Sequence, residues 1–295
     1  MMRTLTTCLW ITLAALTGFA LCPRDGRGEE KETTEEKTPD YERQDFSVKV
    51  GDRQFVATVL SPPQNKLARH PALLLKFTSD RNTALFTSPY CLVPRAFLEH
   101  GHRVVSFDIP CHGDRIGRFG GSIPGLRNSF VAGVDPFAMF VEDGRSVISE
   151  CIRRGWATSG RIAVEGPSRA GYMVLRLLAA DERIAVAAGM APVTDWRLLR
   201  EFVSARDRKD VASIRLTHFV EKMAGRHVYL AIGKTDERVG TAACQELYHA
   251  LKKAQVDAGY DASCVEFVLT DDPGHSINSA YQQGIDFLLK WSDER

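Results

Sequence analysis

The sequence lacks an excess of charge of either sign, a dense set of cysteines, and the spacings that mark common metal and phosphate sites. Lysine and arginine number 38, and aspartate and glutamate number 37, so the formal net charge is +1. This balance provides no basic surface for nucleic acid and no acidic tail for a basic partner. Seven cysteines in 295 residues are too few for a disulfide scaffold. No C-x-x-C, H-E-x-x-H or G-x-x-x-x-G-K-[ST] occurs, so we expect no metal, no cofactor and no nucleic-acid partner.

The first residues have the composition of an export signal. Arg3 is followed by an uncharged, largely apolar stretch from Leu5 to Leu21, with the small residues Gly18 and Ala20 near its end. This pattern predicts a secretory signal peptide over residues 1–20, cleaved after Ala20, and hence an exported protein, periplasmic or secreted. An uncleaved N-terminal membrane anchor stays open as the alternative, because about 17 residues approach the minimum length of a membrane-spanning helix.

Residues 21–44 are rich in charged residues and contain almost no aliphatic side chains. Such a segment buries too little apolar surface to offset the entropy lost on ordering, so we predict a disordered linker. From residue 45 to residue 295 the sequence shows no internal repeat and no second change of composition. We therefore predict one domain over residues 45–295, with no stable membrane domain once the signal is removed.

Strand patterns alternate with helix patterns through that domain. Period-two alternation on both sides of Gly51 predicts an antiparallel hairpin over residues 46–60. Apolar runs predict further strands at 72–77, 103–107, 161–165, 184–188, 227–232 and 264–269. Amphipathic spacing predicts helices at 90–100, 136–154, 169–180, 195–223, 241–258 and 276–291. This order indicates an α/β fold, with a mostly parallel central sheet, an N-terminal antiparallel hairpin and helices on both faces.

The strongest functional pattern is Gly166-Pro167-Ser168-Arg169-Ala170, which lies between a predicted strand and a predicted helix. A serine on a tight strand-to-helix turn has its hydroxyl lifted clear of the sheet. The turn needs very small residues two positions before and after the serine, and Gly166 and Ala170 satisfy this requirement. The start of the helix also directs backbone N–H groups at an oxyanion formed on Ser168. We predict that Ser168 is a catalytic nucleophile.

A serine nucleophile needs a base and an acid that orients the base. His275 follows the last predicted strand, and Asp236 follows the strand before it, which is the order nucleophile, acid, histidine. The carboxyl ends of parallel strands lie at one edge of a sheet, so we expect these side chains to meet Ser168 there.

Three other aspartates compete with Asp236 for the same role. Asp195 follows the preceding strand and is typical of a helix N-cap. Asp271 and Asp272 neighbour His275 in sequence, but precede a proline, which is typical of a turn. We therefore favour Asp236 as the catalytic acid.

These segments resemble an α/β-hydrolase, and among them the prolyl-oligopeptidase-like and dienelactone-hydrolase-like serine hydrolases. The resemblance covers about residues 70–291 and depends on RIAVEGPSRAGYMVLRLLAAD, APVTDW, GKTDERVG, DDPGHS and FDIPCHGDR. It implies an oxyanion hole from the backbone N–H of Arg169 and a second N–H at Phe77 or Thr78. The sequence departs from the family pattern at two places. Ala170-Gly171 replaces the usual Gly-Gly, and no His-Gly or glycine-rich loop follows the strand that ends at Phe77.

Three further segments border the predicted site in sequence. Residues 115–128 are rich in glycine and predict a mobile loop over the site. Residues 195–223 predict either a cap over the pocket or an ordinary long crossover. The adjacent Cys111 and His112 predict a structural turn rather than a nucleophile pair, because neighbouring side chains in an extended loop point apart. Buried free thiols are expected for the cysteines from Cys91 onward, with one bridge left open in an exported protein.

Together these patterns predict an exported serine hydrolase that forms an acyl-enzyme on Ser168. Prolyl oligopeptidases carry a large domain ahead of the hydrolase that restricts entry to peptides, and nothing in this sequence corresponds to it. We therefore expect a small-molecule carboxylic ester as substrate, with carbohydrate-linked esters among the candidates. A peptidase of the prolyl-oligopeptidase type and a catalytically silent scaffold used for binding are the alternatives.

Overall fold

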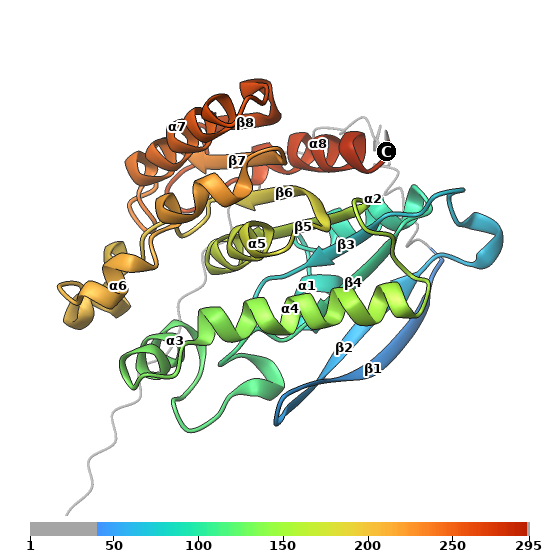
Figure 1. The fold of residues 1–295 in the computed structure, drawn as a ribbon, viewed down its shortest axis with the longest axis horizontal. Helices are drawn as coiled ribbons and strands as arrows, with labels where there is room; N and C mark the ends of the chain where they lie inside the picture. The colour runs from blue at the N-terminus through green and yellow to red at the C-terminus, as the bar shows by residue number, and fades with distance from the viewer. Residues whose placement is uncertain (1–39, 294–295) are drawn as a thin grey trace, which may run out of the picture. The chain divides into compact units, whose positions relative to one another are not determined.

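A computed structural model describes residues 40–293 of the chain. These residues form one eight-stranded sheet with the order β1-β2-β4-β3-β5-β6-β7-β8 (Figure 1). The strands are β1 (Glu42–Val50), β2 (Arg53–Ser61), β3 (Leu73–Lys76), β4 (Arg103–Phe107), β5 (Ile162–Pro167), β6 (Ile184–Met190), β7 (His227–Gly233) and β8 (Val265–Thr270). β2 runs antiparallel to both of its neighbours, and all other adjacent strands are parallel. The predicted α/β fold with a mostly parallel sheet is confirmed.

The predicted N-terminal hairpin is formed by β1 and β2, with Gly51 in the left-handed region at its turn. β1 begins at Glu42, so residues 42–44, which we assigned to the linker, belong to the sheet. Their exposed side chains give no hydrophobic pattern, and backbone pairing places them, with Glu42 opposite Ser61. The predicted signal peptide over residues 1–20 and most of the predicted linker lie outside the described residues.

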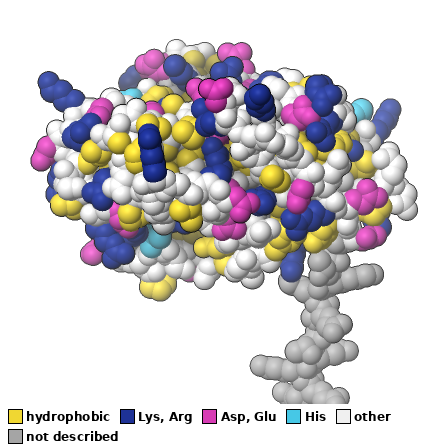
Figure 2. Space-filling model, turned by 90° about the horizontal axis from the view of Figure 1, so that it is seen from below, with side chains coloured by type: hydrophobic (Ala, Val, Ile, Leu, Met, Phe, Trp, Pro, Cys, Tyr) yellow, Lys and Arg dark blue, Asp and Glu magenta, His cyan; other side chains and the backbone are white. Residues whose placement is uncertain are grey.

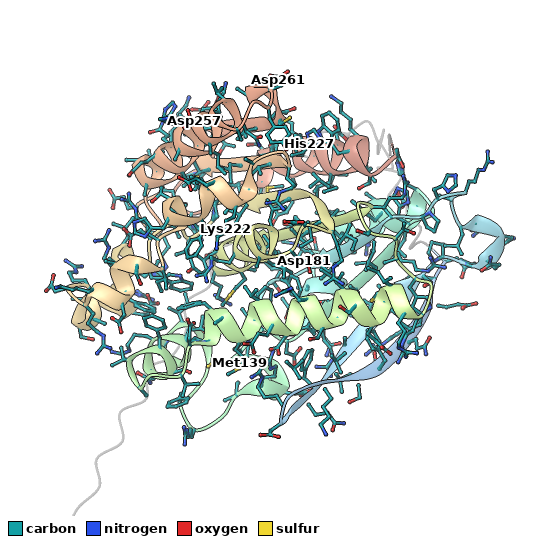
Figure 3. The ribbon with its side chains drawn as sticks, viewed as in Figure 1. Met139, Asp181, Lys222, His227, Asp257 and Asp261 are labelled. Atoms are coloured by element: carbon teal, nitrogen blue, oxygen red, sulfur yellow. The ribbon has the colours of Figure 1, made fainter. Side chains whose placement is uncertain are left out.

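Helices cover both faces of the sheet. They are α1 (Arg81–Phe86), α2 (Leu92–Glu99), α3 (Ser122–Val131), α4 (Pro136–Arg153), α5 (Arg169–Ala180), α6 (Lys209–Ser213), α7 (Thr241–Asp257) and α8 (Tyr281–Asp293). Figure 1 shows α4 and α5 in front of the sheet and α2 behind it, where α2 packs on α8. Every residue of β6 and β7 is buried, as expected for strands covered on both sides. His227 at the start of β7 stacks on Trp291 of α8, with ring centroids 3.5 Å apart (Figure 3).

The segment 195–223 differs from its predicted continuous helix. It contains only α6 and three stretches of 3-10 helix, at Trp196–Leu198, Arg200–Ala205 and Leu216–Met223. The Asp195 carboxylate accepts a hydrogen bond from the N–H of Arg197 and so caps the first 3-10 turn, which ends at Leu198. The amphipathic pattern instead comes from separate apolar side chains that pack into the core. Trp196, Phe202 and Leu216 are all fully buried.

The segment 115–128 also differs from its predicted mobile loop, because α3 begins within it. Its glycines include one that close packing requires, since a Cβ at Gly125 would lie 2.3 Å from the carbonyl oxygen of Gly120. Arg127 donates a hydrogen bond from its guanidinium to the hydroxyl of Ser204 at 2.9 Å. At Gly125, therefore, glycine permits the close approach of two backbone segments.

The surface of the described residues carries both signs of charge. On the face drawn in Figure 2, lysine and arginine side chains are interspersed with aspartate and glutamate, and hydrophobic side chains lie between them. No helix within residues 40–293 is long and apolar enough to cross a membrane.

Candidate active site

Ser168 lies at the sharp turn between β5 and α5. Its backbone has φ 54° and ψ −121°, a conformation that residues other than glycine rarely adopt. The N–H of Ser168 donates to the carbonyl of Met190 at 2.8 Å, and the carbonyl of Ser168 accepts from the N–H of Val193 at 3.0 Å. These bonds hold the strained turn in place, and the Ser168 side chain borders a cavity.

The small residues around Ser168 are required by the closeness of strand and helix. A Cβ at Gly166 would lie 2.7 Å from the carbonyl carbon of Ala170, and a Cβ at Gly171 would lie 2.8 Å from the Cβ of Pro192. Real Cβ atoms essentially never approach so closely, so both positions need glycine. The methyl group of Ala170, the departure from Gly-Gly, is accommodated and fully buried.

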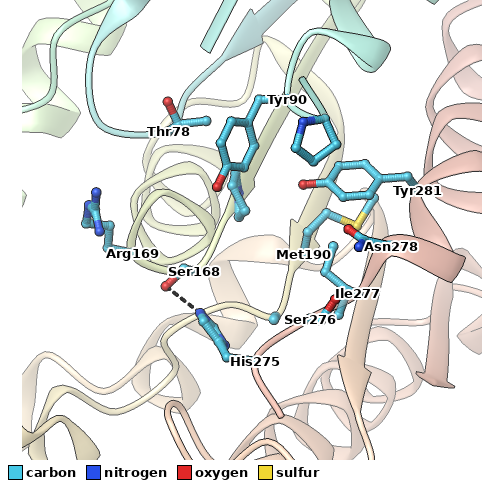
Figure 4. A pocket seen from close by; sticks show the side chains of 13 residues that line it. Thr78, Tyr90, Ser168, Arg169, Met190, His275, Ser276, Ile277, Asn278 and Tyr281 are labelled. Atoms are coloured by element: carbon cyan, nitrogen blue, oxygen red, sulfur yellow. Dashed lines mark hydrogen bonds between the residues drawn. The ribbon is translucent and has the colours of Figure 1, made fainter. Parts of the chain in front are cut away.

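The structure brings His275 and Asp236 to Ser168. The loop after β8 carries His275, and the loop after β7 carries Asp236. His275 Nδ1 lies 2.7 Å from Asp236 Oδ2, and His275 Nε2 lies 3.0 Å from Ser168 Oγ (Figure 4). A carboxylate can only accept hydrogen bonds, so Nδ1 carries the proton and Nε2 accepts from the hydroxyl. This arrangement lets His275 take a proton from Ser168.

Asp236 is fixed on the side away from the histidine. Its side chain is fully buried, and its second oxygen, Oδ1, accepts from the N–H groups of Arg238 at 2.9 Å and Val239 at 3.1 Å. Both carboxylate oxygens are therefore hydrogen-bonded, which satisfies a buried charge.

The competing aspartates have other partners. Asp195 caps the turn that begins at Trp196 and forms an ion pair with Arg197. Asp271 is exposed and pairs with Lys234, while Asp272 accepts from both the N–H and the hydroxyl of Ser279. Geometry thus favours the same acid as the sequence order.

The three predicted oxyanion donors differ in whether their N–H groups are available to an oxyanion. The N–H of Phe77 donates to the carbonyl of Glu165 at 3.0 Å, so it belongs to the β3–β5 ladder, and the prediction for Phe77 is wrong. Thr78 lines the cavity, and no acceptor among the described residues takes its N–H. Arg169 is the first residue of α5, where helical N–H groups have no carbonyl partner in the helix. Thr78 and Arg169 remain as candidate donors.

The cavity beside Ser168 has a volume of about 260 Å³. Sequence reasoning missed four polar residues of its wall, Tyr90, Ser276, Asn278 and Tyr281. Figure 4 shows the rings of Tyr90 and Tyr281 on the side of the cavity opposite His275. Burial raises the pKa of Tyr281, so its phenol stays protonated and can donate a hydrogen bond. The lining residues are Thr78, Pro89, Tyr90, Pro167, Ser168, Arg169, Met190, Ala191, His275, Ser276, Ile277, Asn278 and Tyr281.

Neither segment that we expected near the pocket lines it. No residue of 115–128 or 195–223 borders the cavity, so the first is not a loop over the site, and the second fits the crossover interpretation. His112 lies in a turn held by Asp108, which accepts from the N–H groups of Arg81 and Asp114, each at 2.8 Å. Five cysteines fall within the part of the chain that the structure describes, and four of them are buried free thiols: Cys91, Cys111, Cys151 and Cys244.

Comparison with known proteins identifies one matching family and several similar structures. The model of the prolyl oligopeptidase family matches residues 139–294. A search of curated proteins finds no match. Among solved structures, a protein from Thermus thermophilus is similar at 20% identity and a TM-score of 0.65, over 86% of this chain and 99% of its own. A cold-adapted esterase from an Arctic intertidal metagenomic library is 18% identical with a TM-score of 0.62, over 85% of this chain and 94% of its own.

The acylaminoacyl peptidase of Pyrococcus horikoshii is 14% identical with a TM-score of 0.60, and the match covers 86% of this chain but only 40% of the peptidase. Identities this low show the fold, which is that of the α/β-hydrolases. The family match spans more than half of the 295 residues and includes the positions of Ser168, Asp236 and His275. The chain therefore belongs to the prolyl oligopeptidase family, a family of serine hydrolases.

Proposed function

We propose that this protein hydrolyses carboxylic esters through an acyl-enzyme on Ser168. The observation that carries the proposal is the continuous hydrogen-bonded line from the Asp236 carboxylate through the His275 imidazole to the Ser168 hydroxyl, at the wall of a cavity. A nucleophile, a base and an orienting acid in this geometry are the requirements of acyl transfer.

In the first step, Ser168 Oγ attacks the acyl carbon while His275 Nε2 takes the hydroxyl proton. Asp236 stabilises the resulting imidazolium. The N–H groups of Arg169 and Thr78 stabilise the oxyanion, a contribution worth about 10²–10³ in turnover per donor. The bond between carbon and the leaving oxygen then breaks, and Nε2 gives its proton to that oxygen. In the second step, water attacks the acyl carbon and loses a proton to Nε2. The bond between that carbon and Ser168 Oγ then breaks, Nε2 returns the proton to Oγ, and the carboxylic acid leaves.

Two observations favour an ester over a peptide bond. The cavity of about 260 Å³ suits a short acyl group better than an extended peptide. The similar esterase is matched over 94% of its chain, so this fold supports ester hydrolysis in a protein of nearly the same extent. Carbohydrate-linked esters remain candidate substrates. The family match favours a peptidase as the second candidate, because the family is named for an oligopeptidase.

The test is labelling with a fluorophosphonate, followed by turnover of short 4-nitrophenyl esters and of aminoacyl anilides in parallel. We expect labelling of wild type, faster turnover of the esters, and loss of both labelling and turnover in Ser168→Ala. The matched control is Ser146→Ala, which alters a partly buried serine of α4 outside the cavity lining and should be labelled like wild type. Faster turnover of anilides would establish the peptidase instead. A protein that is neither labelled nor active would indicate a silent binding scaffold.

Export is a separate part of the proposal. The apolar stretch from Leu5 to Leu21, after Arg3 and with small residues before Ala20, supports cleavage by a signal peptidase. Mass spectrometry of the protein recovered after secretory expression should find Leu21 as the first residue. Recovery of the intact N-terminus in the membrane fraction would favour the anchor instead.

A further inference from the structure

Arg169 lines the cavity, and no residue within 40–293 forms an ion pair with its guanidinium. Figure 4 shows the side chain beside Ser168, on the side of the cavity away from Asn278 and Tyr281. Its Nε atom is buried without a hydrogen bond. Within residues 40–293, none of its nitrogens forms an ion pair or a hydrogen bond through the side chain. An arginine is always protonated, so a positive charge with no directly bonded counter-ion lies beside the cavity.

The two carboxylic acids that act electrostatically on Arg169 already bond to other groups. Besides the phenol of Tyr90, which also lines the cavity, these acids are Glu201 and Asp80. The Glu201 carboxylate is held at both oxygens by Arg238, with two hydrogen bonds of 2.8 Å. Asp80 caps α1, where it accepts from the N–H of Thr83 at 2.9 Å and from the hydroxyl of Thr83 at 2.7 Å. Each carboxylate is thus bonded to another residue and forms no ion pair with Arg169.

This arrangement is unfavourable in the empty site. Burial is the main cause that lowers the pKa of Arg169, and the neighbouring Arg238 acts in the same direction. A half-buried cation without a partner is destabilised relative to water, and a ligand that brings an anion removes that penalty. The five N–H donors of a guanidinium match a planar, bidentate acceptor such as a carboxylate.

We propose that Arg169 binds a carboxylate of the substrate, so that the preferred substrates are short monoesters of dicarboxylic acids. This inference rests on the proposed esterase function and adds the substrate class to it. The acyl carbon must reach Ser168 while the free carboxylate reaches the side chain of the next residue, which limits the substrate to a short chain in a cavity of about 260 Å³. A single negative charge is favoured over a phosphate dianion, because Asp80 and Glu201 are nearby.

The test compares pairs of esters that differ only in the carboxylate. The pairs are 4-nitrophenyl hydrogen glutarate with 4-nitrophenyl pentanoate, and 4-nitrophenyl hydrogen succinate with 4-nitrophenyl butyrate. Charged hydrogen bonds are worth about 10- to 100-fold, so we expect wild type to prefer the charged ester of at least one pair by that factor in kcat/KM. Arg169→Gln should abolish the preference, and Arg169→Lys should retain part of it. A ratio of two substrates on one enzyme cancels any change in the shared oxyanion contacts.

The control is Arg206→Gln, which removes an equal charge from an exposed residue outside the cavity lining and should keep the wild-type ratio. Equal ratios in wild type and Arg169→Gln, with ester turnover present, would overturn the inference and leave the proposed function standing. A preference for 3-acetoxybenzoate over phenyl acetate that depends on Arg169, with none within the acyl pairs, would also overturn it, because the carboxylate would then belong to the leaving group.

A binding measurement keeps the inference testable if no ester is turned over. Calorimetric titration of Ser168→Ala with glutarate should show binding that disappears when Arg169→Gln is added. Absence of turnover together with Arg169-dependent glutarate binding would reject the esterase function alone. Absence of glutarate binding to Ser168→Ala would reject the carboxylate site.

Discussion

The role of Asp236 is to hold the proton of His275 on Nδ1. Its carboxylate accepts from His275 Nδ1 at 2.7 Å, and this contact fixes the tautomer whose Nε2 can take the proton of Ser168. Its other oxygen accepts from two backbone N–H groups. An asparagine can preserve these backbone contacts through its oxygen while it offers an amide to the histidine.

We therefore predict that Asp236→Asn lowers kcat for a 4-nitrophenyl ester by about 10³–10⁴-fold, because the amide favours the wrong tautomer of His275. The midpoint of thermal unfolding should change little, since the fold around the loop is kept. Asp271→Asn alters an exposed aspartate of the neighbouring loop and should retain full activity. Comparable kcat values for the two variants would assign the acid to another residue.

The site could be predicted from sequence only where a residue's place in the chain determined its place in space. Ser168, Asp236 and His275 each follow a parallel strand, and such positions meet at one sheet edge whatever the details of packing. The prediction of Phe77 as an oxyanion donor was wrong, because the availability of its N–H depends on how far the pairing of β3 with β5 continues. Tyr281 was missed because the sequence marks it only as one residue of an amphipathic helix.

At the scale of elements, the strand-to-helix turn depends on how closely β5 and α5 approach. A methyl group at position 166 would overlap the backbone of Ala170 at 2.7 Å, and backbone cannot move aside as a flexible side chain can. We predict that Gly166→Ala costs about 1–3 kcal/mol of stability and also lowers kcat, because Ser168 shifts with the turn. Denaturant unfolding and ester turnover measure the two effects.

The matched control for that prediction is Gly117→Ala. Gly117 has no atom within 4 Å of an added Cβ and lies outside the cavity lining. Its stability and kcat should equal those of wild type. If Gly166→Ala also keeps the stability and kcat of wild type, the close approach of β5 and α5 is not the reason that position 166 needs glycine.

β3 and β5 also share a fully buried ion pair between Lys76 and Glu165, directly before the two loops that supply Thr78 and Ser168. Burial lowers the pKa of Lys76 and raises the pKa of Glu165, and their mutual attraction opposes both shifts. The cost of removing the charges from water is met only while both partners are present.

We predict that Lys76→Met and Glu165→Leu each lower the free energy of unfolding by about 3–5 kcal/mol, because each leaves one buried group unpaired. The double variant should lose far less than the sum, since no buried charge then remains. Guanidinium denaturation of the four proteins provides the double-mutant cycle. Additive losses would show that the two side chains are not coupled.

Short elements were hardest to predict. α1 has six residues and is defined by its cap, in which Asp80 accepts from the N–H of Thr83. α3 begins after Gly121 in a glycine-rich segment whose composition favours a loop. In both cases tertiary contacts decide the conformation, and local propensity carries little information. The strands and the helices α4, α5 and α7 were placed within a few residues, because their periodicity extends over many positions. The longest predicted helix, 195–223, was wrong.

For the whole molecule, acid stability depends on a histidine outside the cavity lining. His112 is buried, its Nδ1 lies 2.9 Å from the carbonyl of Pro110, and its Nε2 has no partner. Burial is the main cause that lowers its pKa from 6.5 to about 4; the Pro110 carbonyl opposes this shift, and the charge of Arg169 adds to it. The folded protein therefore holds His112 neutral at pH values where the unfolded chain protonates it.

The sign of the effect follows from proton binding. Between pH 6.5 and 4 the unfolded chain binds the additional proton, so stability is fully present above pH 6.5 and is lost as the pH falls toward 4. We predict that wild type loses about 2 kcal/mol more than His112→Asn between pH 7 and pH 5, as measured by denaturant unfolding at each pH. His70→Asn, at an exposed position, should follow wild type. Parallel losses in wild type and His112→Asn would place the acid-sensitive group elsewhere in the molecule.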